Sequence, residues 1–138
     1  MNIKLLHPDA VVPTRGTSSS AGWDLYAIED TIIYPGDNAV IPTGIAIEIP
    51  NGWFGLLTHR SSLAFKVDTI ASLGIIDSDY RGEIKGKVFN LGKLPVHIKK
   101  GSRFAQIVFH QHLWFSNFKI VDELSTTKRE GGMGSTGI

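Results

Sequence analysis

Hydrophobic and polar residues alternate with a period of two along much of the chain, which is the pattern of half-buried β-strands. In Gly44–Pro50, isoleucine recurs at every second position. In Glu83–Asn90, Ile84, Gly86 and Val88 alternate with Lys85, Lys87 and Phe89. Phe104–His110 is a further apolar strand candidate. Helical periodicity is hard to find, and Ser61–Ser72 is the one stretch in which we expect a short helix.

Turn-forming residues divide the chain into these short segments. Fifteen glycines and six prolines are present, and the clearest turn signals are Pro35–Asp37, Pro50–Gly52, Asn90–Lys93 and Lys99–Gly101. Short strands at regular spacing with such turns favour a β-sandwich, a jelly roll or a small barrel of antiparallel strands. We therefore predict an all-β fold.

Composition narrows the class of protein further. The chain has 138 residues, of which 42% are hydrophobic and 20% charged, the balance of one ordinary globular domain. Its net charge of +1 gives no overall field that would attract nucleic acid or a membrane surface. Without cysteine it has no disulfide, thiolate metal site or cysteine nucleophile. We see no signal peptide and no membrane span, and expect a soluble protein of the cytoplasm.

The C-terminal stretch Ser125–Gly137 differs from the rest because it is rich in Gly, Ser and Thr. Such a composition cannot supply a core, so we expect a mobile tail. Its glycine N–H groups, together with the hydroxyls of Ser135 and Thr136 and the basic pair Lys128 and Arg129, would suit a phosphate cradle. The alternative is a disordered tail without a ligand.

Two internal segments carry dense polar chemistry. In His59–Ser62, an arginine and two hydroxyls follow a strand, which suits phosphate oxygens, although a plain helix N-cap with a surface arginine is the alternative. Gly74–Glu83 holds two aspartates, Tyr80, an arginine and flanking glycines, a pattern that predicts a hairpin. A carboxylate at a strand end can act as a general base, and the alternative is an Asp-rich turn.

Two isolated polar residues lie in apolar strands. Asp24 follows Ala21-Gly22-Trp23, and a buried carboxylate there is either structural or near a metal ion. Gln106 in the last strand is either a ligand contact or a satisfied core amide. The chain has neither a P-loop motif nor a zinc signature among its five histidines.

Taken together and in this order, these segments resemble the five motifs of the trimeric dUTPase family. The resemblance extends from about Lys4 to Gly137, and Gly74–Glu83 is its most specific part. The matching segments, with the family pattern in parentheses, are Ala21–Ala27 (AGYDLYA), Arg60–Ala64 (RSGLA), Gly74–Glu83 (GVIDxDYRGE), Gly101–Gln106 (GDRIAQ) and Gly131–Gly137 (GGFGSTG).

The resemblance implies a fold, an activity and an assembly. It implies a β jelly-roll domain over residues 1–120 and a glycine-rich arm over residues 121–138 that closes over an active site. The activity would be magnesium-dependent hydrolysis of dUTP to dUMP and pyrophosphate, which keeps uracil out of DNA. The active sites of a homotrimer would be shared between subunits, and neither nucleic acid nor membrane would be a partner.

The resemblance also implies roles for single residues. Asp77 would activate the water that attacks the α-phosphorus, and Tyr80 would pack on the deoxyribose and leave no room for a 2′-hydroxyl. Asp24 would help to organise Mg²⁺ through water. Backbone groups of Gly74, Ile75 and Ile76 would read the uracil edge. The remaining substrate contacts would come from Arg60, Ser61, Ser62, Gln106, Arg129, Met133, Gly134, Ser135 and Thr136.

Three departures from the family pattern keep alternatives open. Ser62 replaces a usual glycine and gives the Arg-Ser-Ser of dCTP deaminases, which makes a deaminase or a bifunctional enzyme the second hypothesis; the Asp77 and Tyr80 pair argues against it. Met133 replaces the phenylalanine that stacks on uracil. The tail's basic residue is offset, so either Lys128 or Arg129 binds phosphate, and we favour Arg129. A non-enzymatic nucleotide sensor on the same scaffold is the third hypothesis.

Overall fold

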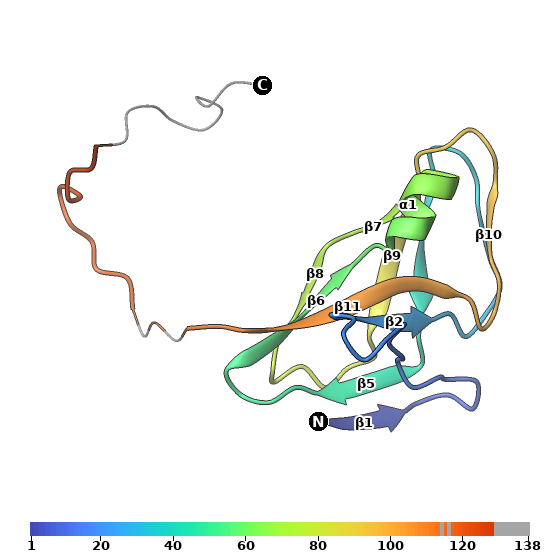
Figure 1. Cartoon of the computed structure of the whole chain (residues 1–138), viewed down its shortest axis with the longest axis horizontal. Helices are drawn as coiled ribbons and strands as arrows, with labels where there is room; N and C mark the ends of the chain where they lie inside the picture. The colour runs from blue at the N-terminus through green and yellow to red at the C-terminus, as the bar shows by residue number, and fades with distance from the viewer. Residues whose placement is uncertain (114, 116, 129–138) are drawn as a thin grey trace.

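The computed structural model describes residues 1–113, 115 and 117–128, and in this part the chain is almost entirely β-structure with one short helix (Figure 1). The elements in chain order are β1 (Asn2–Leu5), β2 (Gly22–Tyr26), β3 (Thr31–Ile33), β4 (Asn38–Pro42), β5 (Ile45–Glu48), β6 (Trp53–Thr58), α1 (Ser61–Val67), β7 (Thr69–Ala71), β8 (Gly74–Ile76), β9 (Lys85–Asn90), β10 (Val96–Ile98) and β11 (Arg103–Gln111).

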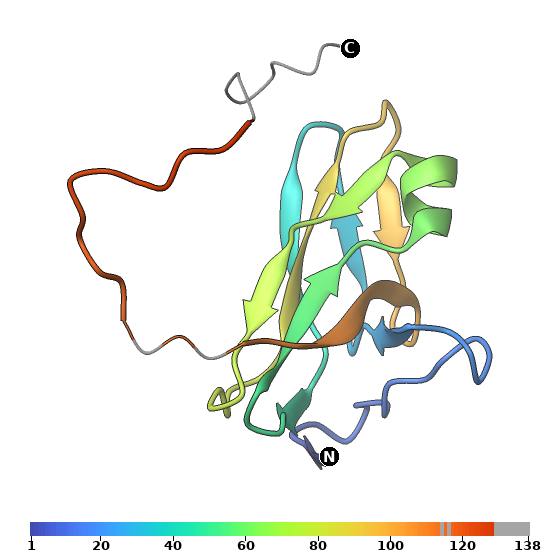
Figure 2. The same ribbon diagram turned by 60° about the vertical axis from the view of Figure 1, so that its left-hand side comes forward.

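The strands pair antiparallel in several sheets. A four-stranded sheet has the order β2-β11-β6-β8, and a three-stranded sheet has the order β4-β9-β7. Two smaller pairs, β1 with β5 and β10 with β3, complete the body. The arrangement of the strands can be followed in Figure 2. Their buried apolar side chains form one core cluster. This arrangement confirms the all-β jelly-roll expectation.

Alternation along the strands correctly predicted most of the side chains that enter the core, but Ala46, expected on the opposite face of β5 (Ile45–Glu48), is also buried, at 6% exposed. Ile45 and Ile47 of β5 are 0% and 5% exposed, and Val88 of β9 is 1% exposed, whereas Lys85 and Lys87 point to solvent. Three of the predicted turns contain glycines in the left-handed region: Gly36 with φ 80°, Gly52 with φ 83° and Gly101 with φ 77°. The burial of one apolar face explains why these segments form strands in this register.

The expected helix is present but shorter than the stretch Ser61–Ser72. It ends at Val67 because Asp68 adopts the left-handed conformation, with φ 50°, and donates its N–H to the carbonyl of Leu63. The following residues then pair with β9 as β7. Helix α1 buries none of its residues, so it lies on the outside of the body.

The segment Gly74–Glu83 is not the hairpin that its sequence suggested. Its first strand, β8, pairs with β6, whereas β9, the next strand in the described part of the chain, pairs with β4 and β7. Residues 77–84 therefore cross from the four-stranded to the three-stranded sheet, and we call them the 77–84 connection. The N–H of Ile84 donates to the carbonyl of Ile45 at 2.8 Å and fixes the end of this crossing.

After β11 the chain leaves the body, and the described residues of this segment run away from the sheets in both views (Figures 1 and 2). Its apolar side chains are strongly exposed, with Phe118 at 102% and Ile120 at 96%. No helix in the described ranges has the length and apolar character needed to cross a membrane.

Candidate functional site

The first group of predicted site residues gathers around Asp24, which lies on β2 and is only 8% exposed. Its Oδ1 accepts a hydrogen bond from Nε of Arg60 at 2.7 Å, and its Oδ2 accepts one from a terminal nitrogen of Arg103 at 3.2 Å. Arg60 also donates to the backbone carbonyl of Arg103 at 3.2 Å. We call Asp24, Arg60 and Arg103 the arginine cluster. One buried carboxylate thus fixes two guanidinium groups.

Arg60 lies at the junction between β6 and α1. It has extended backbone angles, φ −94° and ψ 136°, and it precedes the helix without a side-chain cap hydrogen bond. The hydroxyl side chains of Ser61 and Ser62 follow in the first turn of α1, and both residues are exposed. The junction therefore presents a cation and two hydroxyls together, rather than a capped helix with a free surface arginine.

Gln106 lies beside the arginine cluster on β11, where it is opposite Asp24 on one side and Thr58 on the other. Its Nε2 donates to the carbonyl of His59 at 2.9 Å, just before Arg60. A Cβ atom at Gly22 would lie 2.9 Å from Cδ of Gln106, so the glycine makes room for this amide. The half-buried amide has a backbone partner and still lies next to the cations.

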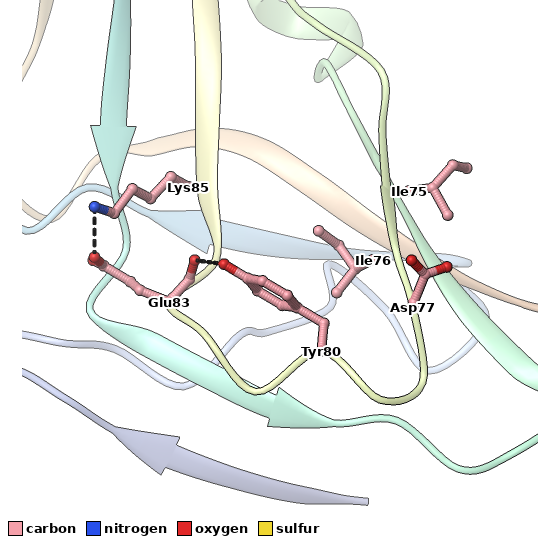
Figure 3. Close-up of a pocket in the computed structure, with 6 residues that line it drawn as sticks. All are labelled: Ile75, Ile76, Asp77, Tyr80, Glu83 and Lys85. Atoms are coloured by element: carbon pink, nitrogen blue, oxygen red, sulfur yellow. Dashed lines mark hydrogen bonds and ion pairs between the residues drawn. The ribbon is translucent and has the colours of Figure 1, made fainter.

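The second group forms a pocket of about 390 Å³, lined by residues of β8, β9 and the 77–84 connection (Figure 3). We call it the Asp77 pocket, and its lining residues are Ile75, Ile76, Asp77, Tyr80, Glu83 and Lys85. Asp77 is exposed directly after β8, and Tyr80 is 43% exposed. The pocket thus combines a carboxylate, an aromatic ring and apolar side chains, a combination suited to a small polar ligand.

Strand β8 adds backbone groups to this pocket. It is the edge strand of the four-stranded sheet, so one side pairs with β6 and the other has no strand partner among the residues that the structure describes. A free edge offers alternating N–H donors and C=O acceptors. Such an edge can hydrogen-bond the rim of a planar ring as it would another strand.

The two groups lie at opposite ends of β6. Asp77 follows Ile76, which pairs with Gly55 near the start of this strand, whereas Arg60 comes just after its end. At about 3.3 Å per residue, six residues of extended chain separate the two places by about 20 Å. A single chain therefore does not bring the carboxylate of Asp77 next to the arginine cluster.

The described residues contain no group of three or more His, Asp or Glu side chains that could hold a metal ion by themselves. Asp24 is the carboxylate of the arginine cluster, and both of its oxygens already accept hydrogen bonds. Mg²⁺ commonly keeps several waters and binds substrate phosphates with one or two protein carboxylates. The donor set fits a magnesium ion of that kind, since a carboxylate oxygen has a second lone pair for a metal-bound water.

Several candidate residues lie outside the described part of the chain: Arg129, Met133, Gly134, Ser135 and Thr136. Lys128, the other candidate for the tail cation, is exposed. Three further residues belong to the two groups although no sequence pattern had given them an individual role: Arg103, Glu83 and Lys85. For Arg103, its place between Gly101 and Gln106 was the available signal.

A model of the dUTPase family matches residues 9–137. A deoxyuridine 5′-triphosphate nucleotidohydrolase of Escherichia phage T5 is 46% identical over 146 residues, which cover 99% of this chain and 98% of the relative. A similar protein of Nautilia profundicola is 44% identical, over 99% of this chain and 98% of its own length.

Solved structures agree with this likeness. The dUTPase of Staphylococcus bacteriophage 80alpha with dUpNHpp superimposes with a TM-score of 0.92 at 30% identity, covering 99% of this chain and 98% of that chain. A mutant dUTPase from phage phi11 of S. aureus, in which a structural Mg(II) ion is coordinated, has a TM-score of 0.82 at 28% identity, covering 88% of this chain and 96% of that one.

Proposed function

The chain belongs to the dUTPase family and hydrolyses dUTP to dUMP and pyrophosphate, and we propose how its own residues carry the reaction. The observation that carries the proposal is the Asp77 pocket, which joins a carboxylate, an aromatic ring and a free strand edge. Removal of dUTP keeps uracil out of DNA. We place this activity in the cytoplasm because free deoxynucleotides are made and used inside the cell.

Asp77 acts as the general base. Its exposed carboxylate takes a proton from a water molecule, and the water oxygen forms a bond to the α-phosphorus. The bond between the α-phosphorus and the bridging oxygen to the β-phosphorus then breaks, and pyrophosphate leaves with that electron pair. The role requires an accessible carboxylate at a fixed strand end, and the end of β8 provides one.

The nucleoside is held by β8 and Tyr80. Backbone groups of Gly74, Ile75 and Ile76 on the free edge form hydrogen bonds with the edge of the uracil ring. These hydrogen bonds distinguish uracil from cytosine, because the two bases present different patterns of carbonyl and N–H groups. The ring of Tyr80 packs on the deoxyribose and leaves no room for a 2′-hydroxyl. The location of both elements in one pocket supports these roles.

The phosphates are held at the arginine cluster. Arg60, Ser61, Ser62 and Gln106 supply cationic and neutral donors, and Asp24 orients Arg60. Mg²⁺ would offset the charge of the triphosphate as the α-phosphorus is attacked, with Asp24 contacting one of its waters. Arg129, Met133, Gly134, Ser135 and Thr136 of the arm 121–138 then close over the bound nucleotide and exclude water.

The first test is a product assay. We expect the protein with Mg²⁺ to convert dUTP to dUMP and pyrophosphate. Excess chelator, which removes Mg²⁺, should reduce kcat/KM at least about tenfold, because the charge of the phosphates is then not offset. Ion-exchange chromatography of the products measures both, with dCTP, dTTP and UTP as parallel substrates. Release of ammonia from dCTP would point to the deaminase instead, and binding of dUTP without turnover would point to a sensor.

We further propose a homotrimer in which each active site combines the Asp77 pocket of one subunit with the arginine cluster of a second. The separation of about 20 Å along β6 supports this arrangement, since Asp77 and Arg60 of one chain cannot hold one triphosphate. The exposed apolar side chains after β11, among them Phe118 and Ile120, support the trimer as well, because a neighbouring subunit could bury them. A cyclic assembly repeats the same contact around the ring.

A mixing experiment tests the shared site. Two inactive variants, Asp77→Asn and Arg60→Ala, should regain activity when their subunits are assembled together, because some sites then receive Asp77 and Arg60 intact from different chains. Random assembly at equal amounts would restore about a quarter of the sites. Sedimentation checks that the mixed species are trimers.

The control for mixing is the assembly of two differently tagged Asp77→Asn preparations, in which no site can be repaired. If the Asp77→Asn and Arg60→Ala mixture also stays inactive, both residues of a site come from one chain, and the shared arrangement is wrong.

A further inference from the structure

The side chain of Tyr80 is held in the Asp77 pocket by the residues that follow it. Its hydroxyl donates to the backbone carbonyl of Glu83 at 3.0 Å (Figure 3). The backbone N–H of Tyr80 donates to the carbonyl of Asp77 at 3.1 Å. The chain thus turns back on itself between Asp77 and Glu83. The ring orientation therefore depends on the end of the 77–84 connection.

The carbonyl that receives this hydrogen bond belongs to a well-anchored residue. The Oε1 of Glu83 accepts the N–H of Gly44 at 2.9 Å, and its Oε2 pairs with Nζ of Lys85 at 3.1 Å. Gly44 is closely surrounded, because a Cβ there would lie 2.9 Å from Cβ of His7, and its φ of 66° is in the left-handed region. Glu83 is therefore a fixed point to which Tyr80 is tied.

Gly82 lies against the hydroxyl end of the Tyr80 ring. A Cβ atom added there would lie 2.6 Å from Cζ of Tyr80, far inside van der Waals contact. The φ of Gly82 is not positive, unlike that of Gly36, Gly44, Gly52 and Gly101. The φ of Gly82 therefore does not itself require glycine, and the three atoms closest to an added Cβ all belong to the side chain of Tyr80.

We infer that Gly82 is a specificity-determining positioning residue, which lets Tyr80 lie close enough to the sugar to exclude a 2′-hydroxyl. The inference rests on the proposed contact of Tyr80 with the deoxyribose. An alanine at position 82 forces the ring outward by about 1 Å, the shift that restores a normal separation of about 3.5–4.0 Å. The displaced atoms belong to the end of a half-exposed side chain, so the fold is retained while the sugar contact is lost.

The measurement is the ratio of kcat/KM for dUTP to kcat/KM for UTP in Gly82→Ala. We expect this ratio to fall at least about tenfold, with less change in kcat for dUTP, because Asp77 is untouched. Gly16→Ala is the matched control: its Cβ would lie 3.6 Å from Oγ of Ser20, an ordinary contact, and the ratio should not change.

A double-mutant cycle with Tyr80→Ala separates positioning from a general structural role. If Gly82 acts through the tyrosine, Gly82→Ala has no further effect on the ratio once the ring is absent. Tyr80→Phe gives a second route that adds no atoms: loss of the hydroxyl that binds Glu83 should lower the ratio about 2- to 10-fold.

The outcomes are distinguishable. If Tyr80→Ala lowers the ratio but a folded Gly82→Ala does not, or if the two substitutions act additively, the inference is overturned and the proposed role of Tyr80 stands. If Tyr80→Ala leaves the ratio unchanged, the sugar contact itself is wrong, and the inference is overturned together with it. Circular dichroism and thermal unfolding confirm that each variant is folded.

Discussion

Asp77→Asn should lower kcat for dUTP hydrolysis by about 10²- to 10⁴-fold, the usual contribution of a positioned general base. Asparagine has the same shape, and the exposed position after β8 requires no buried partner, so the fold should be unaffected. An amide cannot take the proton of the attacking water. Single-turnover kinetics with dUTP and magnesium measure the chemical step, and calorimetry measures binding.

Asp79→Asn is the matched control for this prediction. Asp79 is an exposed carboxylate in the same connection, two residues beyond Asp77, and it does not line the Asp77 pocket. Its loss should leave kcat within about threefold, as for an ordinary surface substitution. Equal losses in both variants would mean that the local charge, and not a base at Asp77, supports the reaction. Retention of full activity in Asp77→Asn would remove Asp77 from the mechanism.

Strand positions were predictable because burial of one face leaves a period of two in the sequence. Ile45 and Val88 follow this rule, and each belongs to a strand that the alternation had indicated. Strand partners are a different matter. The residues between Gly74 and Glu83 look like a hairpin, yet β8 pairs with β6, because the crossing between sheets is decided by contacts far apart in sequence.

The same distinction applies to the site. Asp77 and Tyr80 could be predicted because they stand in a dense local motif. Arg103 stands in a segment that the sequence singled out, but its contact with Asp24 could not be predicted, because a register shift between Arg103 and Ala105 changes which residue of β11 faces β2. The alternation predicts that Lys85 faces outward. It does not predict that Lys85 lines the Asp77 pocket, because that pocket also needs β8, which belongs to another sheet.

Asp24 shows how the structure refines a role taken from sequence. The sequence left it either structural or near a metal ion, and in the structure its two oxygens hold Arg60 and Arg103. These contacts do not remove its capacity to accept a hydrogen bond from a metal-bound water. They do make the orientation of Arg60 depend on the charge of Asp24, and that dependence has a measurable consequence.

We expect Asp24→Asn to lower kcat/KM for dUTP about 10- to 100-fold, as for hydrogen bonds to a charged group. The amide oxygen can still accept from Nε of Arg60, but the amide nitrogen would face the nitrogen of Arg103, so that two donors meet. Arg60 then loses its fixed orientation toward the phosphates. Excess magnesium should not restore the loss, because the defect is in the arginine and not in the metal. Steady-state kinetics over a range of magnesium concentrations test this.

Arg60→Lys should reproduce much of the same loss, because an ammonium group cannot bind Asp24 and a phosphate with the fixed fork of a guanidinium. Glu29→Gln is the control, since Glu29 is an exposed carboxylate in the loop between β2 and β3 and lies in neither group of site residues. If Asp24→Asn recovers full activity at high magnesium while Arg60→Lys does not, then Asp24 serves the metal ion. Its pairing with the arginines would then be a consequence of packing, with no effect on turnover.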